Sequence, residues 1–354
     1  MSLRNILLII SLLLSVVIGL AVARGANASS PGQKPGRQLT IGLSLDTLKE
    51  ERWQGDRDRF VAKAKSLGAA VAVSSANSDD AVQMKDCESL IAQQVDVLVI
   101  VPHDGVAMAK AVSKAKDAGI PVIAYDRLIR DCDLDVYMSF DNVEVGRQQA
   151  RFVVERLKGK GAIVRIYGAP TDNNAKLYKA GQDEILKPYL DRGDITVVHE
   201  DWAEDWKPEN AKRITQAAIT KGAPFVAILA TNDGTAGGAI QALTEEKRTG
   251  ILVTGQDAEL PACQRIAAGA QSMTIYKPLA RLAEGAAEVA VRLAKRQVVV
   301  ANGSVDNSSV KNSPSAIPSV LYNVVTVSQE NLADTVVKDG FLKAKDIYRG
   351  LTSP

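Results

Sequence analysis

From Gln38 onward, short apolar runs alternate along the chain with longer stretches of helical periodicity. The runs are rich in β-branched residues and show little polar alternation, which is typical of strands buried on both faces of a parallel sheet. They predict strands at 39–45, 70–73, 95–101, 121–125, 136–140, 162–167, 195–199, 225–230, 251–255 and 272–276. Because the number of predicted strands is larger than one ordinary sheet contains, we expect two domains of five or six strands each.

The stretches between the runs predict helices. In 106–118, for example, apolar and alanine positions form one face, Gly119 ends the helix, and Pro121 prevents its extension. Strands that alternate with helices indicate an α/β fold, here two Rossmann-like domains, each a parallel sheet with helices on both faces. The polar segment 301–318 breaks this alternation and predicts a long loop, followed by a last strand at 321–327.

The first residues have the pattern of an export signal. Arg4 precedes an apolar run over 6–23, and small residues follow at 21–23 and 26–28. We expect a signal peptide at 1–28, cleaved after Ala23 or Ala28, and a flexible leader at 29–37. The apolar run is close to the shortest that spans a bilayer, so an uncleaved membrane anchor stays open.

Charge is balanced over the rest of the chain. The 354 residues include 43 Lys and Arg and 41 Asp and Glu, and Arg4 and Arg24 are the only charged residues of the first 28. A balanced surface argues against nucleic acid as a partner.

Residues for cofactor, metal or catalytic chemistry are scarce. The sequence has two histidines, His103 and His199, and neither a phosphate-binding loop nor a GxSxG motif. The glycines of 234–238 lie in a helical stretch and favour close helix packing over phosphate binding. The three widely spaced cysteines fit no metal site, although one pair could form a disulfide. We therefore expect no metal, no cofactor and no enzymatic activity.

Polar and aromatic residues gather where the predicted strands end. In open parallel sheets, ligands bind outside the carboxyl ends of the strands. Here those ends lead into clusters of Asp, Asn, Arg, Lys and Trp at 46–53, 125–127, 171–174, 201–206, 231–233, 255–257 and 276–278.

Such clusters suit a neutral sugar. Each sugar hydroxyl both donates and accepts, planar Asp, Asn and Arg groups can engage two neighbouring hydroxyls, and a pyranose face packs on an indole. Plainer interpretations stay open for single residues. Asp172, Asp201 and Asp233 could cap helices, Arg52 could form a surface ion pair with Glu51 or Asp56, and Trp202 or Trp206 could pack in a core.

At these residues the chain resembles the periplasmic sugar-binding proteins of ABC importers, and within them the D-xylose-binding branch. The resemblance extends from about 38 to 342 and is carried by segments 51–58, 124–127, 139–142, 172–176, 232–239, 255–258 and 273–278. It implies a type I periplasmic binding protein fold with a three-segment hinge near 140–143, 276–278 and 321–325. It also implies an N-terminal lobe at 38–141 plus 278–322 and a C-terminal lobe at 142–277 plus 323–354.

The resemblance further implies the residues that contact the sugar, with Trp53 as a stacking partner. They are Arg52, Trp53, Asp126, Arg127, Asp172, Asn174, Trp206, Asn232, Asp257 and Lys277. One departure is Pro102-His103-Asp104-Gly105, where the branch has Pro-Tyr-Asn-Gly. The His and Asp could alter the rim of the pocket or the choice of ligand.

The expected function is that of a monomeric periplasmic protein that binds a monosaccharide, most readily D-xylose, and delivers it by hinge closure to an ABC importer permease. A receptor that senses glucose, galactose or another aldose for chemotaxis or kinase signalling is the alternative. A regulator of the lac repressor type would need a DNA-binding segment where the export signal lies, and a sugar-converting enzyme would need catalytic residues that the sequence does not suggest.

Overall fold

The computed structural model describes residues 37–306 and 316–350. The expected signal peptide at 1–28 and nearly all of the expected leader at 29–37 lie outside the described residues. Within the described ranges, no helix is both long and apolar enough to cross a bilayer.

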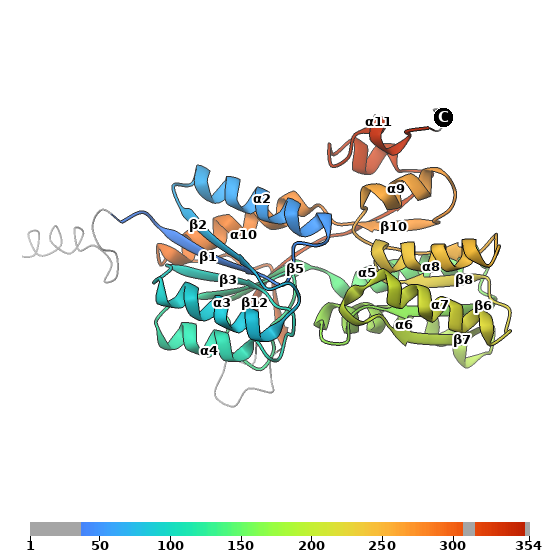
Figure 1. Ribbon diagram of the computed structural model, residues 1–354, viewed down its shortest axis with the longest axis horizontal. Helices are drawn as coiled ribbons and strands as arrows, with labels where there is room; N and C mark the ends of the chain where they lie inside the picture. Colours follow the sequence, from blue (N-terminus) through green and yellow to red (C-terminus); the bar gives the residue numbers. More distant parts are fainter. Residues whose placement is uncertain (1–36, 307–315, 351–354) are drawn as a thin grey trace, which may run out of the picture. The chain divides into compact units, whose positions relative to one another are not determined.

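A seven-stranded sheet forms the first half of the fold (Figure 1). Its strands pair in parallel, except that β11 is antiparallel to β12. In spatial order they are β11(Gly303–Asp306), β12(Ala316–Tyr322), β5(Val136–Phe140), β4(Val122–Tyr125), β3(Val97–Val101), β1(Thr40–Leu45) and β2(Ala70–Ser75).

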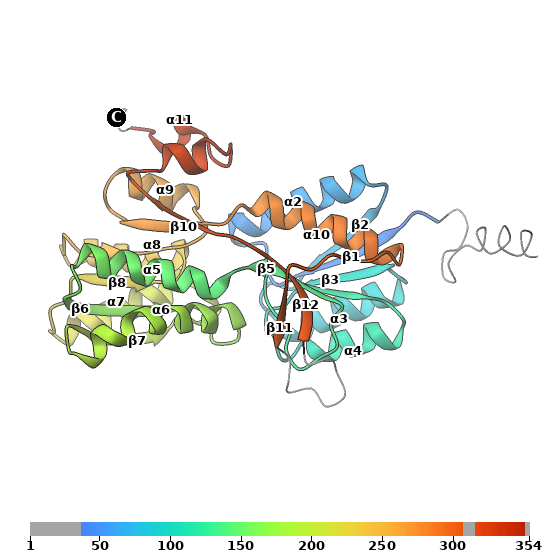
Figure 2. The ribbon, with the colours of Figure 1, turned by 180° about the vertical axis from the view of Figure 1, so that it is seen from behind.

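Two helices cover each face of this sheet. On one face lie α2(Glu51–Ser66) and α10(Leu279–Ala294), and on the other lie α3(Asp80–Ala92) and α4(Ala109–Asp117) (Figures 1 and 2). Strand β3 shows why both faces are apolar. Val97, Val99 and Val101 pack with α2 and α10, whereas Leu98 and Ile100 pack with α3 and α4.

A four-stranded parallel sheet forms the second half, in the order β7(Ile195–Trp202), β6(Gly161–Tyr167), β8(Ala227–Ala230) and β9(Leu252–Val253). Helices α5(Asn142–Arg156) and α6(Asn173–Asp191) cover one face, and α7(Pro208–Thr220) and α8(Asp233–Glu245) cover the other. Figures 1 and 2 show the two pairs from opposite sides.

A small antiparallel pair continues this second half. It consists of β10(Met273–Tyr276) and β13(Val325–Ser328). Backbone bonds from Asp257 N to Ile275 O, at 2.8 Å, and from Ile275 N to Gly255 O, at 3.2 Å, join β10 to the segment after β9. The pair packs with α9(Leu260–Ala267), the short π-helix η2(Ala333–Val337) and α11(Ala344–Ile347).

Three segments connect the two halves: β5 to α5, β10 to α10, and β12 to β13. A backbone bond of 3.1 Å from Asp141 N to Tyr322 O ties two of them together. Parallel sheets with helices on both faces confirm the α/β fold class expected from the sequence.

Several expectations about strands were wrong. The first sheet has seven strands because part of the expected loop 301–318 pairs as β11 and β12, and the second has four because β10 pairs with β13 in a sheet of its own. The last strand expected at 321–327 is two strands, since β12 pairs with β5 and β13 pairs with β10.

Several boundaries also differ from the expectation, and two of them have a clear physical reason. The helix expected at 106–118 begins at Ala109, because the Asp104 carboxylate accepts hydrogen bonds from the N–H groups of Val106 and Ala107. Strand β7 continues to Trp202 through polar residues, which are tolerated because β7 is an edge strand.

Candidate functional site

The candidate site is built on helix N-termini that follow the carboxyl ends of strands. After β6, the Asp172 side chain caps α6 by accepting from Asn174 N at 2.8 Å. After β8, Asn232 caps α8 in a capping box with Thr235. After β1, Glu50 is the first flanking residue of α2, and Arg52 and Trp53 lie in its first turn. These caps fix the backbone from which the polar side chains project.

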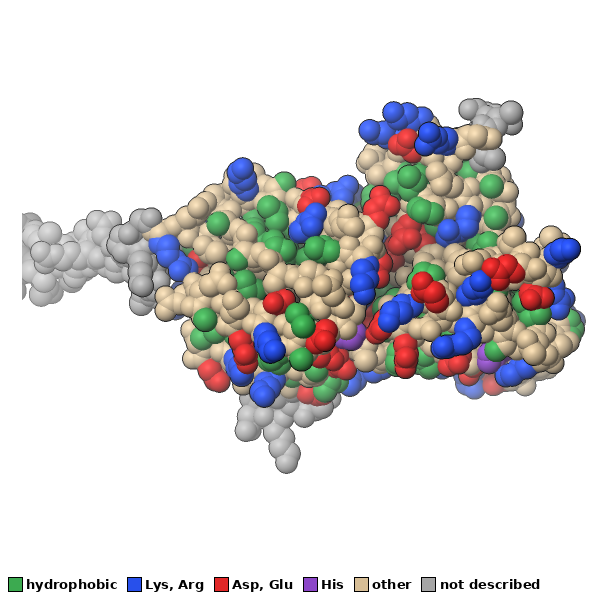
Figure 3. Space-filling view, in the orientation of Figure 1, with side chains coloured by type: hydrophobic (Ala, Val, Ile, Leu, Met, Phe, Trp, Pro, Cys, Tyr) green, Lys and Arg blue, Asp and Glu red, His purple; other side chains and the backbone are tan. Residues whose placement is uncertain are grey.

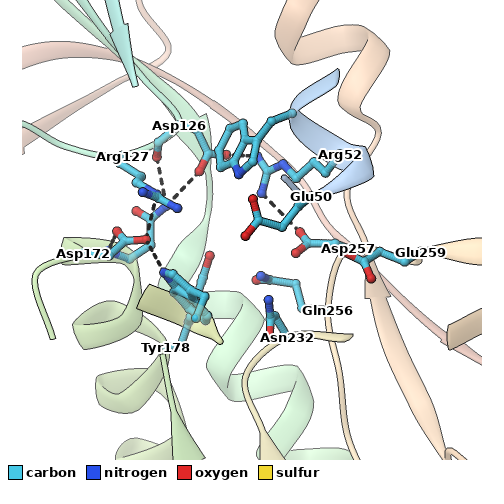
Figure 4. A pocket seen from close by; sticks show the side chains of 13 residues that line it. Glu50, Arg52, Asp126, Arg127, Asp172, Tyr178, Asn232, Gln256, Asp257 and Glu259 are labelled. Atoms are coloured by element: carbon cyan, nitrogen blue, oxygen red, sulfur yellow. Dashed lines mark hydrogen bonds and ion pairs between the residues drawn. The ribbon is translucent and has the colours of Figure 1, made fainter. Parts of the chain in front are cut away.

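The side chains surround one cavity of about 410 Å³, counted together with the solvent at its mouth. Both sheets contribute to the lining (Figure 4). The lining residues are Glu50, Arg52, Trp53, Asp126, Arg127, Asp172, Asn174, Tyr178, Trp206, Asn232, Gln256, Asp257 and Glu259.

Arg52 holds carboxylates from both halves of the fold. Its Nη2 bonds to Asp126 Oδ2, after β4, and its Nη1 lies 3.2 Å from Asp257 Oδ1, after β9. Asp56, one helical turn away, lies 3.9 Å from Nε. All four side chains are nearly inaccessible to solvent, at 8% exposure or less. Removing one partner would therefore leave a buried charge unpaired.

Arg127 makes a second bridge of the same kind. Its Nη1 donates to Asp46 Oδ2 at 2.7 Å, after β1, and its Nε lies 2.9 Å from Asp172 Oδ2, after β6. Asn174 joins the two bridges. Its side-chain Nδ2 donates to Asp126 Oδ1 at 3.0 Å, and its backbone N–H donates to Asp172 Oδ1 at 2.8 Å. Asp46, Asp126 and Asp172 thus form one hydrogen-bonded network with both arginines.

Aromatic rings form the apolar part of the cavity wall. The Trp53 indole lies between two guanidinium groups, 4.4 Å from that of Arg52 and 5.2 Å from that of Arg127. Trp206 Nε1 donates to Asp172 Oδ2 at 3.2 Å, and its ring meets that of Tyr178 edge-on at 6.3 Å. A sugar ring could therefore pack on an indole while its hydroxyls meet charged groups.

Lys277 lies behind the cavity wall rather than in its lining. It is fully buried, with Nζ 3.7 Å from Asp257 Oδ1 and 3.0 Å from Tyr178 OH. Burial lowers the pKa of its ammonium, although Asp257 and Asp126 oppose that shift. Lys277 therefore supports Asp257 and Tyr178 from the side away from the cavity.

For two carboxyl groups at the cavity, burial outweighs the nearby cations, which are Arg127 and Lys49 for Glu50 and Arg265 for Glu259. Burial is the main cause that raises the pKa of Glu50, and burial together with Asp233 and Asp257 raises the pKa of Glu259 to about 8. By contrast, burial raises the pKa of Asp126, but Arg52 and Lys277 oppose it so strongly that the pKa is lowered overall. At neutral pH the Glu259 carboxyl is therefore mostly protonated, so it can donate a hydrogen bond as well as accept one.

Some lining groups have hydrogen-bonding capacity left over. Within the described residues, Glu50 Oε2, Arg52 Nε and Gln256 Oε1 are buried and have no hydrogen-bond partner. Figure 4 shows Glu50, Asn232 and Gln256 pointing toward the same space. Because buried polar groups normally have partners, these atoms are suited to a ligand that both donates and accepts.

The structure brings together nine of the ten residues expected from the sequence, and the tenth, Lys277, lies directly behind them. Arg52 forms an ion pair with Asp56, but in the interior and not on the surface. Asp172 caps a helix, as allowed for, and also lines the cavity.

Among the remaining plainer interpretations, the two helix caps were wrong and the packing role of a tryptophan was right. Asp201 and Asp233 cap no helix: Asp201 lies within β7, and Asn232 occupies the cap position before Asp233. Trp202 packs on Tyr167, with ring centroids 4.8 Å apart, whereas Trp206 packs against a buried hydrophobic cluster and also lines the cavity.

Sequence reasoning missed four lining residues: Glu50, Tyr178, Gln256 and Glu259. Glu50 directly precedes segment 51–58 of the resemblance, and Gln256 lies within segment 255–258. Their positions were therefore a usable signal. Tyr178 is four residues after Asn174 in α6 and shares its face, which helical periodicity could have indicated. Glu259 immediately precedes α9 and gave no signal beyond its charge.

The chemistry of the cavity is that of binding a neutral polyol. Its lining contains carboxylates, amides, guanidinium groups and indoles, but neither a histidine nor a cysteine. No group of three or more potential metal ligands occurs in the part of the chain that the structure describes. The buried cysteines Cys87, Cys132 and Cys263 lie elsewhere and fit the interpretation as small core residues.

Comparison with known proteins agrees with this geometry. The family model described as "periplasmic binding protein domain" matches residues 41–297. The D-xylose-binding periplasmic protein of Haemophilus influenzae is 46% identical over 314 residues, which cover 88% of this chain and 93% of the relative. The multiple sugar-binding periplasmic receptor of Rhizobium radiobacter is 31% identical and covers 96% and 99%.

A solved structure extends the similarity to three dimensions. It is a carbohydrate transporter solute-binding protein of Chloroflexus aurantiacus in complex with D-glucose, with a TM-score of 0.79 and 33% identity, covering 88% of this chain and 98% of that one. Extent of match and identity together establish the family: the chain belongs to the periplasmic binding proteins, among the sugar-binding solute-binding proteins of ABC transporters.

Proposed function

We propose that this chain binds one monosaccharide, D-xylose before others, in the cavity lined by both sheets, and delivers it to an ABC importer permease. The observation that supports this most is the pair of buried arginines, Arg52 and Arg127, each of which holds carboxylates from both halves of the fold around one cavity. The 46% identity to a D-xylose-binding protein favours xylose as the ligand.

The proposed affinity is physically reasonable. An aldopentose has about ten non-hydrogen atoms, and the best small ligands gain about 1.5 kcal/mol per atom. Micromolar binding requires about 8 kcal/mol, which is roughly half of that ceiling. Arg52, Asp257, Gln256 and Asn232 supply charged and amide groups that are themselves buried, and hydrogen bonds are stronger where the local dielectric constant is low.

Binding proceeds through closure of two lobes. The proposed lobes are 38–141 with 278–322 and 142–277 with 323–354, joined at the three connecting segments. Opening would break the contacts of Arg52 with Asp257 and of Arg127 with Asp172, and a sugar held from both sides shifts the equilibrium toward the closed form.

A second candidate is a receptor of wider sugar specificity that signals instead of delivering its ligand. It is favoured by the 31% identity to a multiple sugar-binding receptor and by the solved relative that holds D-glucose. The unpartnered Glu50 Oε2 would accept a hydrogen bond from a larger aldose. The two candidates differ in ligand range and in the membrane protein that docks.

A thermal-shift screen over D-xylose, D-ribose, L-arabinose, D-glucose and D-galactose tests the proposal. A ligand that binds only the folded state stabilises it by about 2.7 kcal/mol at 100 times Kd. We expect D-xylose to raise Tm most, whereas comparable shifts with hexoses would favour the wider receptor. If no monosaccharide changes Tm at millimolar concentration, the sugar-binding proposal is wrong.

The remaining expectations belong to the same proposal. The mature protein is a monomer in the periplasm, released by cleavage after Ala23 or Ala28, which sequencing of its N-terminus would establish. It catalyses no reaction and binds no nucleic acid. The face in Figure 3 supports the latter, because basic and acidic side chains are interspersed over it.

A further inference from the structure

His103, the residue that departs from the resemblance, connects the two halves of the fold. It follows β3 of the seven-stranded sheet, and its backbone N–H donates to Gln83 Oε1 at 2.8 Å. Its Nδ1 lies 3.0 Å from Asp80 Oδ1, at the start of α3, and its Nε2 lies 3.3 Å from Asp205 Oδ1, after β7 of the four-stranded sheet. The imidazole is only 13% exposed, whereas the side chains of Asp80 and Asp205 are 43% and 33% exposed.

The charges around this ring favour its protonated form. A neutral imidazole donates from one nitrogen only, whereas a ring between two carboxylates needs both nitrogens to donate. Facing it are Asp46 after β1, Asp80 in α3 and Asp205 in η1(Glu204–Trp206). The nearby cations are already bound: Lys207 Nζ lies 2.7 Å from Asp205 Oδ2, and Arg127 holds Asp46.

These charges also set the direction of the pKa shift. Burial lowers the pKa of His103, but Asp46, Asp80 and Asp205 raise it by more, so that the pKa is raised overall. Arg127, which is bonded to Asp46, and Lys207, which is bonded to Asp205, weaken the attraction without removing it. The ring therefore keeps its proton to higher pH while both carboxylates are in place.

Asp205 belongs to the turn that presents Trp206 to the cavity. Both residues have left-handed backbones, with φ of 53° for Asp205 and 58° for Trp206, a conformation that costs free energy unless neighbouring contacts hold it. Trp206 in turn bonds to Asp172, the carboxylate held by Arg127. A contact that holds Asp205 therefore also holds an indole of the candidate sugar site.

We propose that His103, as an imidazolium, is a positioning residue that holds the Trp206 turn in the closed form through Asp205, so that sugar binding takes up a proton. The inference rests on the proposed sugar binding and closure. In the open form His103 keeps Asp80 but loses Asp205, so its pKa is lower there than in the closed form. Closure consequently takes up protons between these two pKa values.

The sign of the pH effect follows from this difference. A group whose pKa is higher in the bound form adds affinity that is fully present below the open-form pKa and is lost as pH rises through the closed-form pKa. One carboxylate contact is commonly worth about one pKa unit, so we expect D-xylose to bind about three to ten times more tightly at pH 6 than at pH 8.5.

Calorimetry of D-xylose binding in two buffers of different ionisation enthalpy measures the proton uptake directly. Wild type should take up a fraction of a proton near neutral pH. In His103→Gln the uptake that belongs to this ring should be lost, and in both His103→Gln and Asp205→Asn the affinity should depend less steeply on pH than in wild type. The matched control is His199→Gln, because His199 lies on β7 beside Lys221 and does not line the cavity.

The two proposals can fail separately. If D-xylose binds and the uptake is the same in wild type and His103→Gln, the role of His103 is refuted while sugar binding stands. If no monosaccharide binds at any pH, both proposals are wrong. Loss of affinity in His103→Gln with an unchanged pH slope would mean a packing role only, which also contradicts the proton-linked mechanism.

Discussion

Among single residues, Arg127 shows why the candidate site is sensitive to change. Its guanidinium joins Asp46 and Asp172 from different sheets, and its face lies 5.2 Å from the Trp53 ring. We expect Arg127→Ala to weaken sugar binding by at least about 2 kcal/mol, roughly thirtyfold, because buried carboxylates lose their partner. Calorimetry with D-xylose measures this loss.

The control for this substitution is Arg192→Ala, which removes an exposed arginine paired with Asp194 and should leave the affinity unchanged. Asp257→Ala provides a second test from the other half of the fold, since it removes a partner of Arg52. Unchanged affinity in both Arg127→Ala and Asp257→Ala would contradict their assignment to the site.

Asp56 makes stability depend on pH. It is buried in α2, accepts from Tyr125 OH at 2.8 Å, and burial raises its pKa to about 6. Since the unfolded carboxyl titrates near 4, this group favours folding most below that pH, and its contribution falls as pH rises through about 6. Urea unfolding should show the wild type losing about 1–3 kcal/mol relative to Asp56→Asn between pH 4 and pH 7.5.

The comparison with Asp56→Asn isolates one group, because asparagine can still accept from Tyr125. Asp191→Asn, on an exposed pair with Lys187, should run parallel to wild type. If wild type and Asp56→Asn also run parallel, Asp56 does not titrate as described.

For single residues, the sequence predicted which side chains belong to the site better than it predicted which side chains they contact. Arg52 and Asp126 stood out because charged groups followed apolar strands. Arg52 also contacts Asp257, which is 205 positions away in the sequence. This contact depends on how the two sheets meet, and a local sequence pattern carries no information about that arrangement. Glu259 was missed for the same reason, since it looks ordinary in its own loop.

Among the elements, the crossing of α5 and α6 sets the position of Asn174 and Tyr178. The helices approach closely at two glycines: a Cβ on Gly146 would collide with the Tyr178 carbonyl, and a Cβ on Gly181 with the Val143 carbonyl. We expect Gly181→Ala to lower the free energy of unfolding by about 1–3 kcal/mol and to weaken sugar binding, because α6 must shift. Urea unfolding and calorimetry measure the two effects.

Gly237→Ala is the matched control. Gly237 lies within α8, and an added Cβ would have as its nearest neighbour Arg265 Nη1 at 3.4 Å, an ordinary contact. Because alanine is the better helix former, this variant should be as stable as wild type or more so. Equal stability of Gly181→Ala and Gly237→Ala would show that the crossing is not tight.

Elements with strong apolar patterns were predicted well, and polar ones were not. Strand β5 was predicted at its observed bounds, and the glycines of 234–238 lie in a helix as expected. β11 was missed because it is short, lacks an apolar run and is the edge strand of its sheet, paired with β12. The left-handed turn at Asp205 and Trp206 likewise depends on contacts with Asp172 and His103.

For the whole molecule, closure around the sugar implies a change in size. Without sugar, the pairs Arg52–Asp257 and Arg127–Asp172 compete with water and separate when the lobes open. We expect small-angle X-ray scattering to show a smaller radius of gyration with saturating D-xylose than without it. Identical profiles would mean that binding needs no closure.

Direct calorimetric titration of the unmodified chain with D-xylose tests the central claim, that buried side chains of both sheets replace water around one neutral sugar. We expect a single saturable site with a micromolar Kd and a negative heat-capacity change. Absence of saturable binding up to millimolar D-xylose would contradict the assignment of xylose, and the same absence with the other aldoses would contradict the account as a whole.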